Sequence, residues 1–415
     1  MNTCRKILAD HGASAAEFLF LAAAGVLIGF AVSLFEALFG WGLILIQNWR
    51  VHFPVWTCLS LPVAGLLVVW LFTRYGGLAS RGMNLIFEVS QGKPERLPRR
   101  TVFLTTVATW ISHLAGASVG REGVAVQIGA AVSWQFGHFF HKKIEIPNIR
   151  TIFLVTGMAA GFAGLFGTPF SAVFFALEVL VAGTLKYRAM GPAICAAFSA
   201  SWLSARLGLQ IHTYAIREVV PFSIDRQWLT MLALGLAFGA AGGLFAWSLR
   251  KVRALAVKKL PDPFRRILVL GSLLALLMLL TQNRYAGSGA GLIAAPFQGQ
   301  PVQVQDFLLK GAFTILSLAA GFIGGEVTPL FSIGVTLGAV LGPVLGCDPM
   351  LSAALGFAAV FGSGTNTFLA PVMIGMEIFG FQWFPWFFVV CAVSYLVNRN
   401  QSIYSLQQRY GLHDV

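Results

Sequence analysis

Glu122 follows an arginine in the stretch GASVGREGVAVQIG (116–129), which is otherwise mostly small and apolar. Gly120 and Gly123 free the backbone around the acid and a helix pattern resumes after them, so the spacing predicts that Glu122 stands at the start of a helix. The free N–H groups and the dipole of a helix start attract anions. A carboxylate there can itself occupy an anion site and leave it on protonation. The alternatives are a salt bridge to neighbouring Arg121 or a simple helix cap.

A second segment, GGEVTPLF (324–331), repeats this arrangement of glycines, an acid and a helix start. The helix is expected to begin at Val327, with Pro329 in its first turn, where proline is favoured. Two helix N-termini that converge from two parts of the chain form an anion cradle without a full positive charge. We therefore expect Glu122 and the backbone near Val327 to belong to one site.

The elements that carry these residues are expected to lie in a membrane. Hydrophobic residues make up 57% of the 415 residues and charged residues only 11%, whereas soluble domains hold roughly 25% charged residues. The apolar runs that are long enough, or nearly so, to cross about 30 Å of hydrocarbon are 57–73, 151–182, 189–205, 229–249, 267–280 and 383–397. The sequence predicts an all-α polytopic membrane protein whose 45 Gly and 17 Pro favour short, closely packed and often broken helices.

The net charge of +13 comes largely from basic clusters between the apolar runs, at 93–100, 141–150 and 250–266. This is the pattern of cytoplasmic loops under the positive-inside rule, and it also favours anionic membrane lipids. Arginine and aromatic residues are not interleaved, so we expect no nucleic-acid partner. The polar start MNTCRKILADHG (1–12) predicts no cleavable signal, and we expect both termini in the cytoplasm. The five cysteines are scattered, which favours buried small hydrophobes over disulfides or metal ligands.

Segments of the first half match segments of the second half in the same order. The two matches pair 162–179 with 361–378, and 120–137 with 325–342. Internal duplication is common among transporters, and interrupted helices at matching positions point to the substrate site. The predicted organisation is an N-terminal segment 1–13, a first transmembrane repeat 14–209, a connector 210–225, a second transmembrane repeat 226–398 and a C-terminal segment 399–415.

The same segments resemble those of the CLC anion channels and transporters. GREGVAVQIG (120–129) is similar to the family's G-[KR]-E-G-P segment, which carries its gating glutamate, and GGEVTPLFSIGVTLGAVLG (324–342) is similar to its G-x-F-x-P segment. NQSIYSLQQ (400–408) resembles the terminal helix that supplies an anion-coordinating tyrosine, here Tyr404. The resemblance covers about residues 14–408. It implies the CLC fold with two inverted repeats of short, tilted, broken helices, a homodimer with one pore per subunit, and a C-terminal helix and tail without CBS domains.

Departures from the chloride-type pattern are equally informative. RGMNLI (81–86) stands where those members carry G-S-G-I-P, whose serine binds the anion, and Val124 replaces the proline of G-[KR]-E-G-P. The internal proton-transfer glutamate of the chloride exchangers would fall at Val179 and is therefore absent. RGMNLI together with GGEVTP (324–329) resembles the fluoride-exporting branch of the family, the bacterial fluoride/proton antiporters.

The resemblance assigns roles residue by residue. Glu122 takes the role of the gating and protonatable glutamate, and Glu326 is the candidate for a second proton or fluoride relay. Met83 is the substituted selectivity position, with Ser80, Arg81 and Asn84 as alternatives for it. The predicted anion-binding residues are Met83, Asn84, Gly123, Val327, Thr328 and Tyr404.

The sequence thus predicts a fluoride/proton antiporter that exports fluoride from the bacterial cytoplasm across the inner membrane. A chloride/proton exchanger or a passive chloride channel on the same scaffold is the alternative, and a solute carrier unrelated to anions is a third possibility. An intramembrane enzyme that uses Ser288 or His113 lacks a spaced nucleophile and base, so we expect no enzymatic activity, no cofactor and no metal. Glu178 and Glu377, which the repeats pair, are expected to cap or brace helices.

Overall fold

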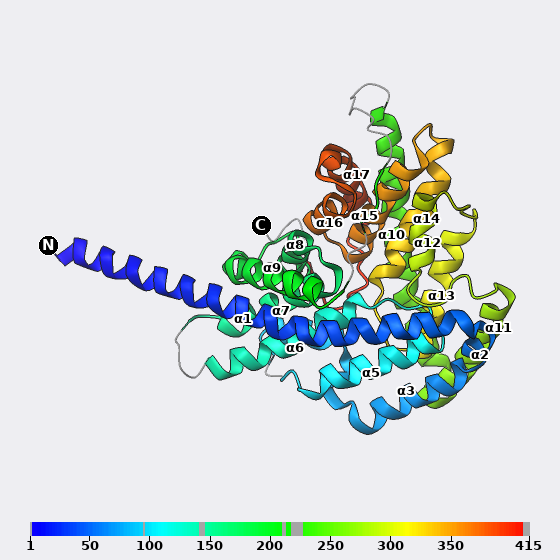
Figure 1. Cartoon of the computed structure of the whole chain (residues 1–415), viewed down its shortest axis with the longest axis horizontal. Helices are drawn as coiled ribbons and strands as arrows, with labels where there is room; N and C mark the ends of the chain where they lie inside the picture. The colour runs from blue at the N-terminus through cyan, green and yellow to red at the C-terminus, as the bar shows by residue number, and fades with distance from the viewer. Residues whose placement is uncertain (1, 94–95, 141–145, 210–212, 217–226, 410–415) are drawn as a thin grey trace.

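The computed structural model describes residues 2–93, 96–140, 146–209, 213–216 and 227–409 (Figure 1). The first half holds α1 (Asn2–His52), α2 (Pro54–Leu59), α3 (Leu61–Tyr75), the 3-10 turn η1 (Gly77–Arg81), α4 (Met83–Ser90), α5 (Arg100–Leu114), α6 (Glu122–Phe140), α7 (Ile149–Phe166), α8 (Pro169–Glu178), β1 (Val181–Ala182), η2 (Tyr187–Ala189) and α9 (Met190–Arg206). Most of the predicted connector 210–225 lies outside the described residues.

The second half holds α10 (Gln227–Lys259), α11 (Pro263–Leu280), α12 (Ala290–Ala294), η3 (Pro296–Gln298), α13 (Asp306–Ala320), α14 (Val327–Val344), α15 (Pro349–Thr365), α16 (Leu369–Phe379), η4 (Phe381–Trp383), α17 (Phe384–Val397) and β2 (Gln408–Arg409). The apolar run 151–182 is not one helix. Gly167 has a left-handed φ of 68° and Pro169 follows at the start of the next helix, so α7 ends and α8 begins there.

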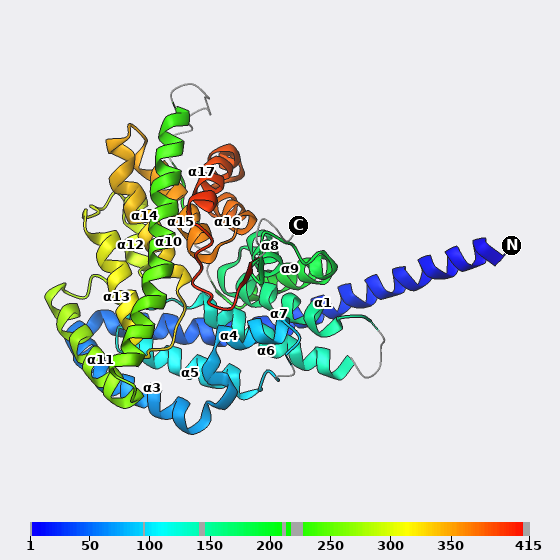
Figure 2. The same cartoon turned by 180° about the vertical axis from the view of Figure 1, so that it is seen from behind.

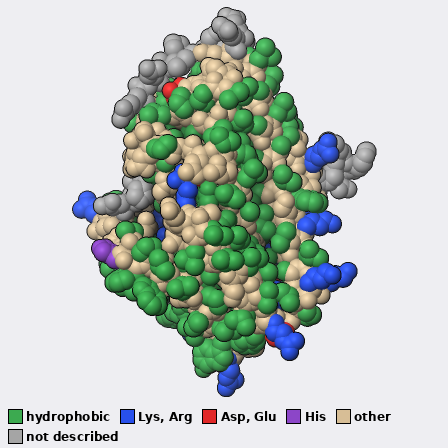
Figure 3. All heavy atoms as spheres, turned by 90° about the vertical axis from the view of Figure 1, so that its right-hand side faces the viewer, with side chains coloured by type: hydrophobic (Ala, Val, Ile, Leu, Met, Phe, Trp, Pro, Cys, Tyr) green, Lys and Arg blue, Asp and Glu red, His purple; other side chains and the backbone are tan. Residues whose placement is uncertain are grey.

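Helix length and surface chemistry agree with a membrane setting. Five helices of the described chain are long and apolar enough to span a bilayer, within Ala15–His52, Ile149–Phe166, Gln227–Lys259, Pro263–Leu280 and Val327–Val344. Hydrophobic side chains cover most of the face shown in Figure 3, and Lys and Arg side chains lie mostly at its margins. An apolar belt with basic margins is the surface that a bilayer stabilises.

Helix pairs approach closely at positions that the sequence repeat matches. A Cβ at Gly129 of α6 would collide with the main chain of α7 at Gly157, and a Cβ at Gly334 of α14 would collide with the main chain of α15 at Gly356. Small residues that let helix backbones approach are typical of packing inside membranes. The two halves therefore use the same contact at equivalent positions.

Glu178 and Glu377 join the halves by reciprocal helix caps. The carboxylate of Glu178, at the end of α8, accepts hydrogen bonds from the N–H groups of Phe368 (2.5 Å), Leu369 (3.0 Å) and Ala370 (3.3 Å), where α16 begins. The carboxylate of Glu377, on α16, accepts from the N–H groups of Phe170 (2.9 Å) and Ser171 (2.8 Å), where α8 begins. The prediction that these acids cap helices is confirmed. Each acid caps the helix that carries the other acid. Reciprocal contacts of this kind are typical of two parts related by a two-fold axis.

The C-terminal segment does not form the terminal helix that the family resemblance implied at 400–408. Among the described residues to 409 it runs as an irregular chain that ends in β2, which pairs in parallel with β1, and 410–415 lie outside the described residues. Arg399 and Asn400 have φ values of 55° and 58°, which end the helical path. Backbone groups then bond to the interior, for example the Ile403 N–H to the Gly364 carbonyl at 2.9 Å. Figure 2 shows this red segment passing between the second half and the helices of the first.

Candidate anion site

The two predicted helix starts meet at one backbone bridge. Gly120 and Gly325 pair as an isolated antiparallel bridge, with N···O distances of 2.6 Å from Gly120 to Gly325 and 2.7 Å in the reverse direction. These glycines occupy matched positions in the two repeats. The bridge brings together the N-terminus of α6, at Glu122, and the N-terminus of α14, at Val327.

The carboxylate of Glu122 lies on the N-terminus of α14. Its Oε2 accepts hydrogen bonds from the main-chain N–H groups of Thr328 (2.9 Å) and Arg121 (3.0 Å), and its Oε1 accepts from the Thr328 hydroxyl. The residue is fully buried. Because the free N–H groups of a helix start bind anions, the Glu122 carboxylate occupies a position suited to a small anion. An acid of one half thus fills a donor site to which the other half contributes the N–H and the hydroxyl of Thr328.

Arg121 is a partner of Glu122, but at the outer limit of a salt bridge. Its Nε lies 3.9 Å from Oε1 of Glu122, and its guanidinium sits 5.8 Å from the ring centre of Phe166. The salt bridge and the helix-terminus site were alternatives at the level of sequence. Both contacts occur, and the shorter ones belong to the helix terminus.

A cavity of about 550 Å³ adjoins this arrangement, and we call it the tyrosine pocket. Predicted site residues that line it are Met83, Asn84, Gly123, Glu326 and Tyr404, together with the alternatives Ser80 and Arg81. Val327 and Thr328 are buried and do not line it. The structure therefore places the predicted residues in two adjacent groups, one around the Glu122 carboxylate and one around the pocket.

Met83 reaches the pocket through a tight turn. The turn η1 ends at Gly82, whose φ of 55° and ψ of −129° suit glycine, and α4 begins directly at Met83. A Cβ added to Gly123 would lie 4.0 Å from Cγ of Met83 and 3.9 Å from Oε2 of Glu326. The thioether chain, the start of α6 and the second acid therefore meet at one wall.

Glu326 is held from the side of the pocket by a cation. It directly precedes α14, and its Oε1 lies 3.2 Å from Nη2 of Arg253 on α10. Arg253 itself lines the pocket. The two acids Glu122 and Glu326 thus flank the start of α14, each with its own arginine.

Tyr404 presents a hydroxyl without a protein partner in the described chain. Its ring packs on Phe87 with centroids 5.3 Å apart, and the residue is only 4% exposed. Gln407 anchors the segment through Nε2, which donates to the carbonyls of Val179 (2.9 Å) and Thr365 (3.0 Å). The phenol is therefore fixed at the pocket wall with a donor available to a ligand.

Sequence reasoning missed two residues of this pocket. Gln127, one turn after Gly123 on α6, lines it with an Oε1 that is buried and has no hydrogen-bond partner within the described residues. An amide in an apolar helix on the face of a site residue is a signal that could have found it. No feature of the sequence distinguished Arg253, because it belongs to the basic run 250–266, which the positive-inside rule assigns to a loop near the membrane.

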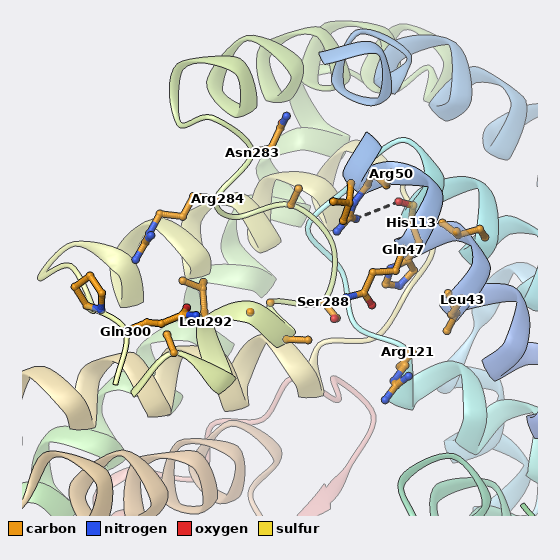
Figure 4. Close-up of a pocket in the computed structure, with 18 residues that line it drawn as sticks. Leu43, Gln47, Arg50, His113, Arg121, Asn283, Arg284, Ser288, Leu292 and Gln300 are labelled. Atoms are coloured by element: carbon orange, nitrogen blue, oxygen red, sulfur yellow. Dashed lines mark hydrogen bonds between the residues drawn. The ribbon is translucent and has the colours of Figure 1, made fainter. Parts of the chain in front are cut away.

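A second cavity, of about 480 Å³, lies near Arg121, and we call it the arginine pocket. Its lining includes Arg50, Arg121, Arg284 and His113 (Figure 4). Nη1 of Arg50 donates to the His113 carbonyl at 3.2 Å. Ser288 lines the same pocket, but no hydrogen bond joins Ser288 to His113 in the described chain, and Nε2 of His113 lies 3.4 Å from the Gly120 carbonyl. The pocket offers positive charge and no nucleophile–base pair.

The comparisons with known proteins agree with this geometry. The family model described as voltage gated chloride channel matches residues 64–399. A chloride/fluoride channel protein of Pseudomonas syringae pv. tomato is 38% identical over 399 residues, covering 94% of this chain and 86% of that protein.

Solved structures give the same picture. The crystal structure of a CLC-type fluoride/proton antiporter, 42% identical, superposes with a TM-score of 0.91 and covers 95% of this chain and 99% of the other. A slow cyanobacterial Cl⁻/H⁺ antiporter, 21% identical, superposes with a TM-score of 0.80 over 93% of this chain and 96% of the other, which shows the fold. This predominantly helical, multi-pass membrane protein belongs to the voltage gated chloride channel family, the CLC proteins.

Proposed function

We propose that this protein exchanges fluoride for protons and exports fluoride from the bacterial cytoplasm. The observation that carries the proposal is the Glu122 carboxylate on the N–H groups at the start of α14. A group that is an anion when ionised and neutral when protonated competes with a free anion for these donors only in its ionised form. The relatives named as a chloride/fluoride channel protein and a CLC-type fluoride/proton antiporter support the choice of fluoride.

The exchange follows from the competition at this site. Protonation removes the charge of Glu122, and the neutral acid gives up the donors of Thr328 and Arg121. Fluoride then enters the cradle and is coordinated by the same N–H groups, with the Tyr404 hydroxyl, Asn84 and the backbone at Gly123 and Val327 along its path. Loss of the proton returns the carboxylate, which displaces the anion. Each cycle moves a proton one way and fluoride the other.

We assign the tyrosine pocket to the cytoplasmic side. Arg250 and Arg253, which line it, belong to the basic run 250–266, and such runs between apolar segments gather on the cytoplasmic side of membrane proteins. The helix α1 ends near the arginine pocket, where Arg50 lies, so its N-terminus is directed to the opposite side. Both termini are then cytoplasmic, and inward proton flow across the bacterial inner membrane drives fluoride outward.

Glu326 is the proposed relay between the tyrosine pocket and Glu122. It stands at the same helix start as Thr328, whose hydroxyl and N–H hold the Glu122 carboxylate. A carboxylate with one arginine contact and one face on the pocket can take up a proton or guide an anion.

The proposed assembly is a homodimer in the lipid bilayer. Exposed apolar side chains recur on one face of α9, at Ile194, Phe198 and Trp202, and again on α17, at Phe384 and Phe388. Phe198 and Phe388 also make edge-to-face contacts in this region, with ring centroids 5.1 Å from Phe170 and 5.3 Å from Phe368 respectively. Single-molecule photobleaching in membranes measures the subunit number. A monomer with full activity would remove the dimer proposal.

The deciding experiment uses purified protein in liposomes. Fluoride efflux and chloride efflux are recorded with ion-selective electrodes, with and without a pH gradient. The proposal expects fluoride efflux that is much faster than chloride efflux and that drives proton uptake. Coupled chloride movement would indicate a chloride/proton exchanger, and uncoupled movement a passive channel.

A further inference from the structure

Glu36 is a carboxylic acid in the middle of α1 that no step of the proposed exchange uses. Its side chain has no solvent exposure, and neither carboxyl oxygen has a hydrogen-bond partner in the described part of the chain. An ionised carboxylate without donors is strongly penalised in an apolar interior. Glu36 does not lie in a loop or at a helix end, because α1 is continuous through this position.

Glu36 lies in a small polar site, which we call the polar cell, between α1, α7 and α9. A Cβ added to Gly164 of α7 would lie 3.3 Å from Cγ of Glu36 and 3.3 Å from Oγ of Ser204 on α9. The Ser204 hydroxyl is itself buried and without a partner in the described chain. The Glu36 side chain and the Ser204 hydroxyl therefore both lie beside Gly164, and neither the carboxyl nor the hydroxyl has a hydrogen-bond partner in the described chain. A neutral carboxylic acid is accommodated there far better than a carboxylate.

Arg121 approaches the polar cell of Glu36 along α7, because its guanidinium covers the ring of Phe166, two residues beyond Gly164. The other helices packed around Glu36 bring their charges elsewhere. Arg206 of α9 stacks over Trp202 at 5.4 Å, and Arg150 and Arg100 stand at the beginnings of α7 and α5. His113, at the end of α5, faces the Gly120 carbonyl.

The same arginine contacts the gating acid. Nε of Arg121 lies 3.9 Å from Oε1 of Glu122, and its guanidinium covers Phe166, two residues beyond Gly164. Arg121 thus contacts one acid, Glu122, and lies beside the segment of α7 that packs on the other, Glu36. A single positive charge stabilises one carboxylate well and two poorly, since two carboxylates close to it also repel each other.

Glu36 also lies on the side of α1 that leads to the arginine pocket. Glu36 shares this face with Leu43, Gln47 and Arg50, because the positions recur at intervals of seven, four and three residues. Those three residues line the pocket. Seven residues of helix separate Glu36 from Leu43 by about 10 Å along the axis.

We propose that Glu36 is a further proton site of the exchange cycle, besides Glu122 and the relay candidate Glu326, and shares Arg121 with Glu122 as a common counter-charge. This inference rests on the proposed fluoride/proton exchange. While Glu122 is ionised, Arg121 pairs with it and Glu36 keeps its proton. When the proton passes from Glu36 to Glu122 through water, an O–H bond breaks on Glu36 and one forms on Glu122. Arg121 then stabilises the Glu36 carboxylate, which regains a proton from the arginine pocket. One carboxylate and one arginine remain paired at every stage.

The test compares Glu36→Gln with Glu17→Gln as its matched control. Glu17 lies on the same helix, is 36% exposed and contacts Arg188 at 3.5 Å, so its removal leaves the polar cell intact. In liposomes, Glu36→Gln should retain fluoride efflux, whereas fluoride-driven proton uptake should fall about tenfold or more, as for loss of a proton-transfer group. The control should change neither flux. The proposal would be overturned if Glu36→Gln kept the wild-type rate of fluoride-driven proton uptake and the wild-type pH dependence of fluoride efflux.

Infrared difference spectroscopy supplies a readout that does not depend on transport. The C=O stretching band of a protonated carboxylic acid should be present in the wild type at neutral pH, persist in Glu17→Gln and vanish in Glu36→Gln. Ser204→Ala should shift the band, because it removes the hydroxyl beside the acid. If Glu36→Gln does not fold, Glu36→Asp and Arg121→Lys should each shift the band. No acid band, or a band indifferent to these changes, contradicts the assignment. The two proposals can fail separately. If the wild type does not transport fluoride but the band is still lost in Glu36→Gln, the exchange function is rejected and the assignment of a protonated carboxyl to Glu36 stands.

Discussion

The main-chain N–H of Thr328 donates to the Glu122 carboxylate at 2.9 Å, although the two residues are 206 positions apart in the chain. This bond joins the first acid of α6 to the first turn of α14, so the two halves of the protein build one donor site together. Removal of the negative charge of Glu122 must therefore alter both halves at once.

Glu122→Gln should abolish proton uptake linked to fluoride movement, because an amide neither titrates nor competes as an anion. The measurement is the pH change that follows fluoride addition to liposomes that contain the variant. Glu17→Gln, on the exposed part of α1, serves as the control and should keep the wild-type signal. Undiminished uptake in Glu122→Gln would remove this residue from the mechanism.

Met83→Ser should erode the preference for fluoride over chloride. Met83 meets Gly123 and Glu326 at the wall of the tyrosine pocket, and a shorter hydroxyl side chain both widens this wall and adds a donor that suits a larger anion. Specificity depends on penalising the wrong ion as well as favouring the right one. We expect the ratio of fluoride to chloride efflux to fall roughly tenfold. An unchanged ratio would contradict the role of Met83 and leave the fluoride assignment intact.

Tyr404→Phe should slow fluoride transport without loss of folding. The variant keeps the ring contact with Phe87 and loses only the hydroxyl, which has no protein partner in the described chain. A hydrogen bond to a charged group contributes about 1.5–3 kcal/mol, so transport at low fluoride should fall about tenfold or more. Tyr187→Phe, at a tyrosine that is 68% exposed, is the matched control and should transport fluoride at the wild-type rate. Equal rates for both variants would exclude the phenol from the path.

Gly129→Ala and Gly334→Ala should destabilise the protein to a similar extent. In each case the added methyl group collides with the main chain of the neighbouring helix, and overpacking of this kind costs about 1–3 kcal/mol. Thermal melting in detergent, followed by circular dichroism, measures the effect. Gly291→Ala is the control, since its Cβ meets no atom within 4 Å, and it should melt close to the wild type. A large loss at only one of the two glycines would argue against equivalent contacts in the two halves.

Local chemistry was enough to predict part of the site from the sequence. The helix starts at Glu122 and Val327 follow from glycine, proline and acid placement over a few residues, and the helices α6 and α14 begin there. The capping role of Glu178 and Glu377 was also predicted, because the repeat pairs them next to helix breaks.

Contacts between distant segments were not predictable in the same way. The family resemblance implied a helix at 400–408, but the backbone groups of this segment bond to both halves in the interior and hold it irregular. Glu36 lies within the apolar helix segment Ala15–His52, where only the packing of α7 and α9 reveals that its carboxyl lacks a partner in the described chain. Arg253 resembled any other basic residue near a membrane until its distance to Glu326 was known.

The bridge between Gly120 and Gly325 joins equivalent positions of the two repeats, so it lies where an axis of symmetry between them would pass. In a dimer of two identical chains, each ionisable side chain beside such an axis would be present twice. Two copies of the same acid at this position would repel each other. In this single chain, Glu122 faces Val327 at the matching position. Glu326, beside the same bridge, matches Arg121 in the other repeat. A fused and diverged pair of halves can therefore set each acid opposite a residue of another type, which two identical subunits could not.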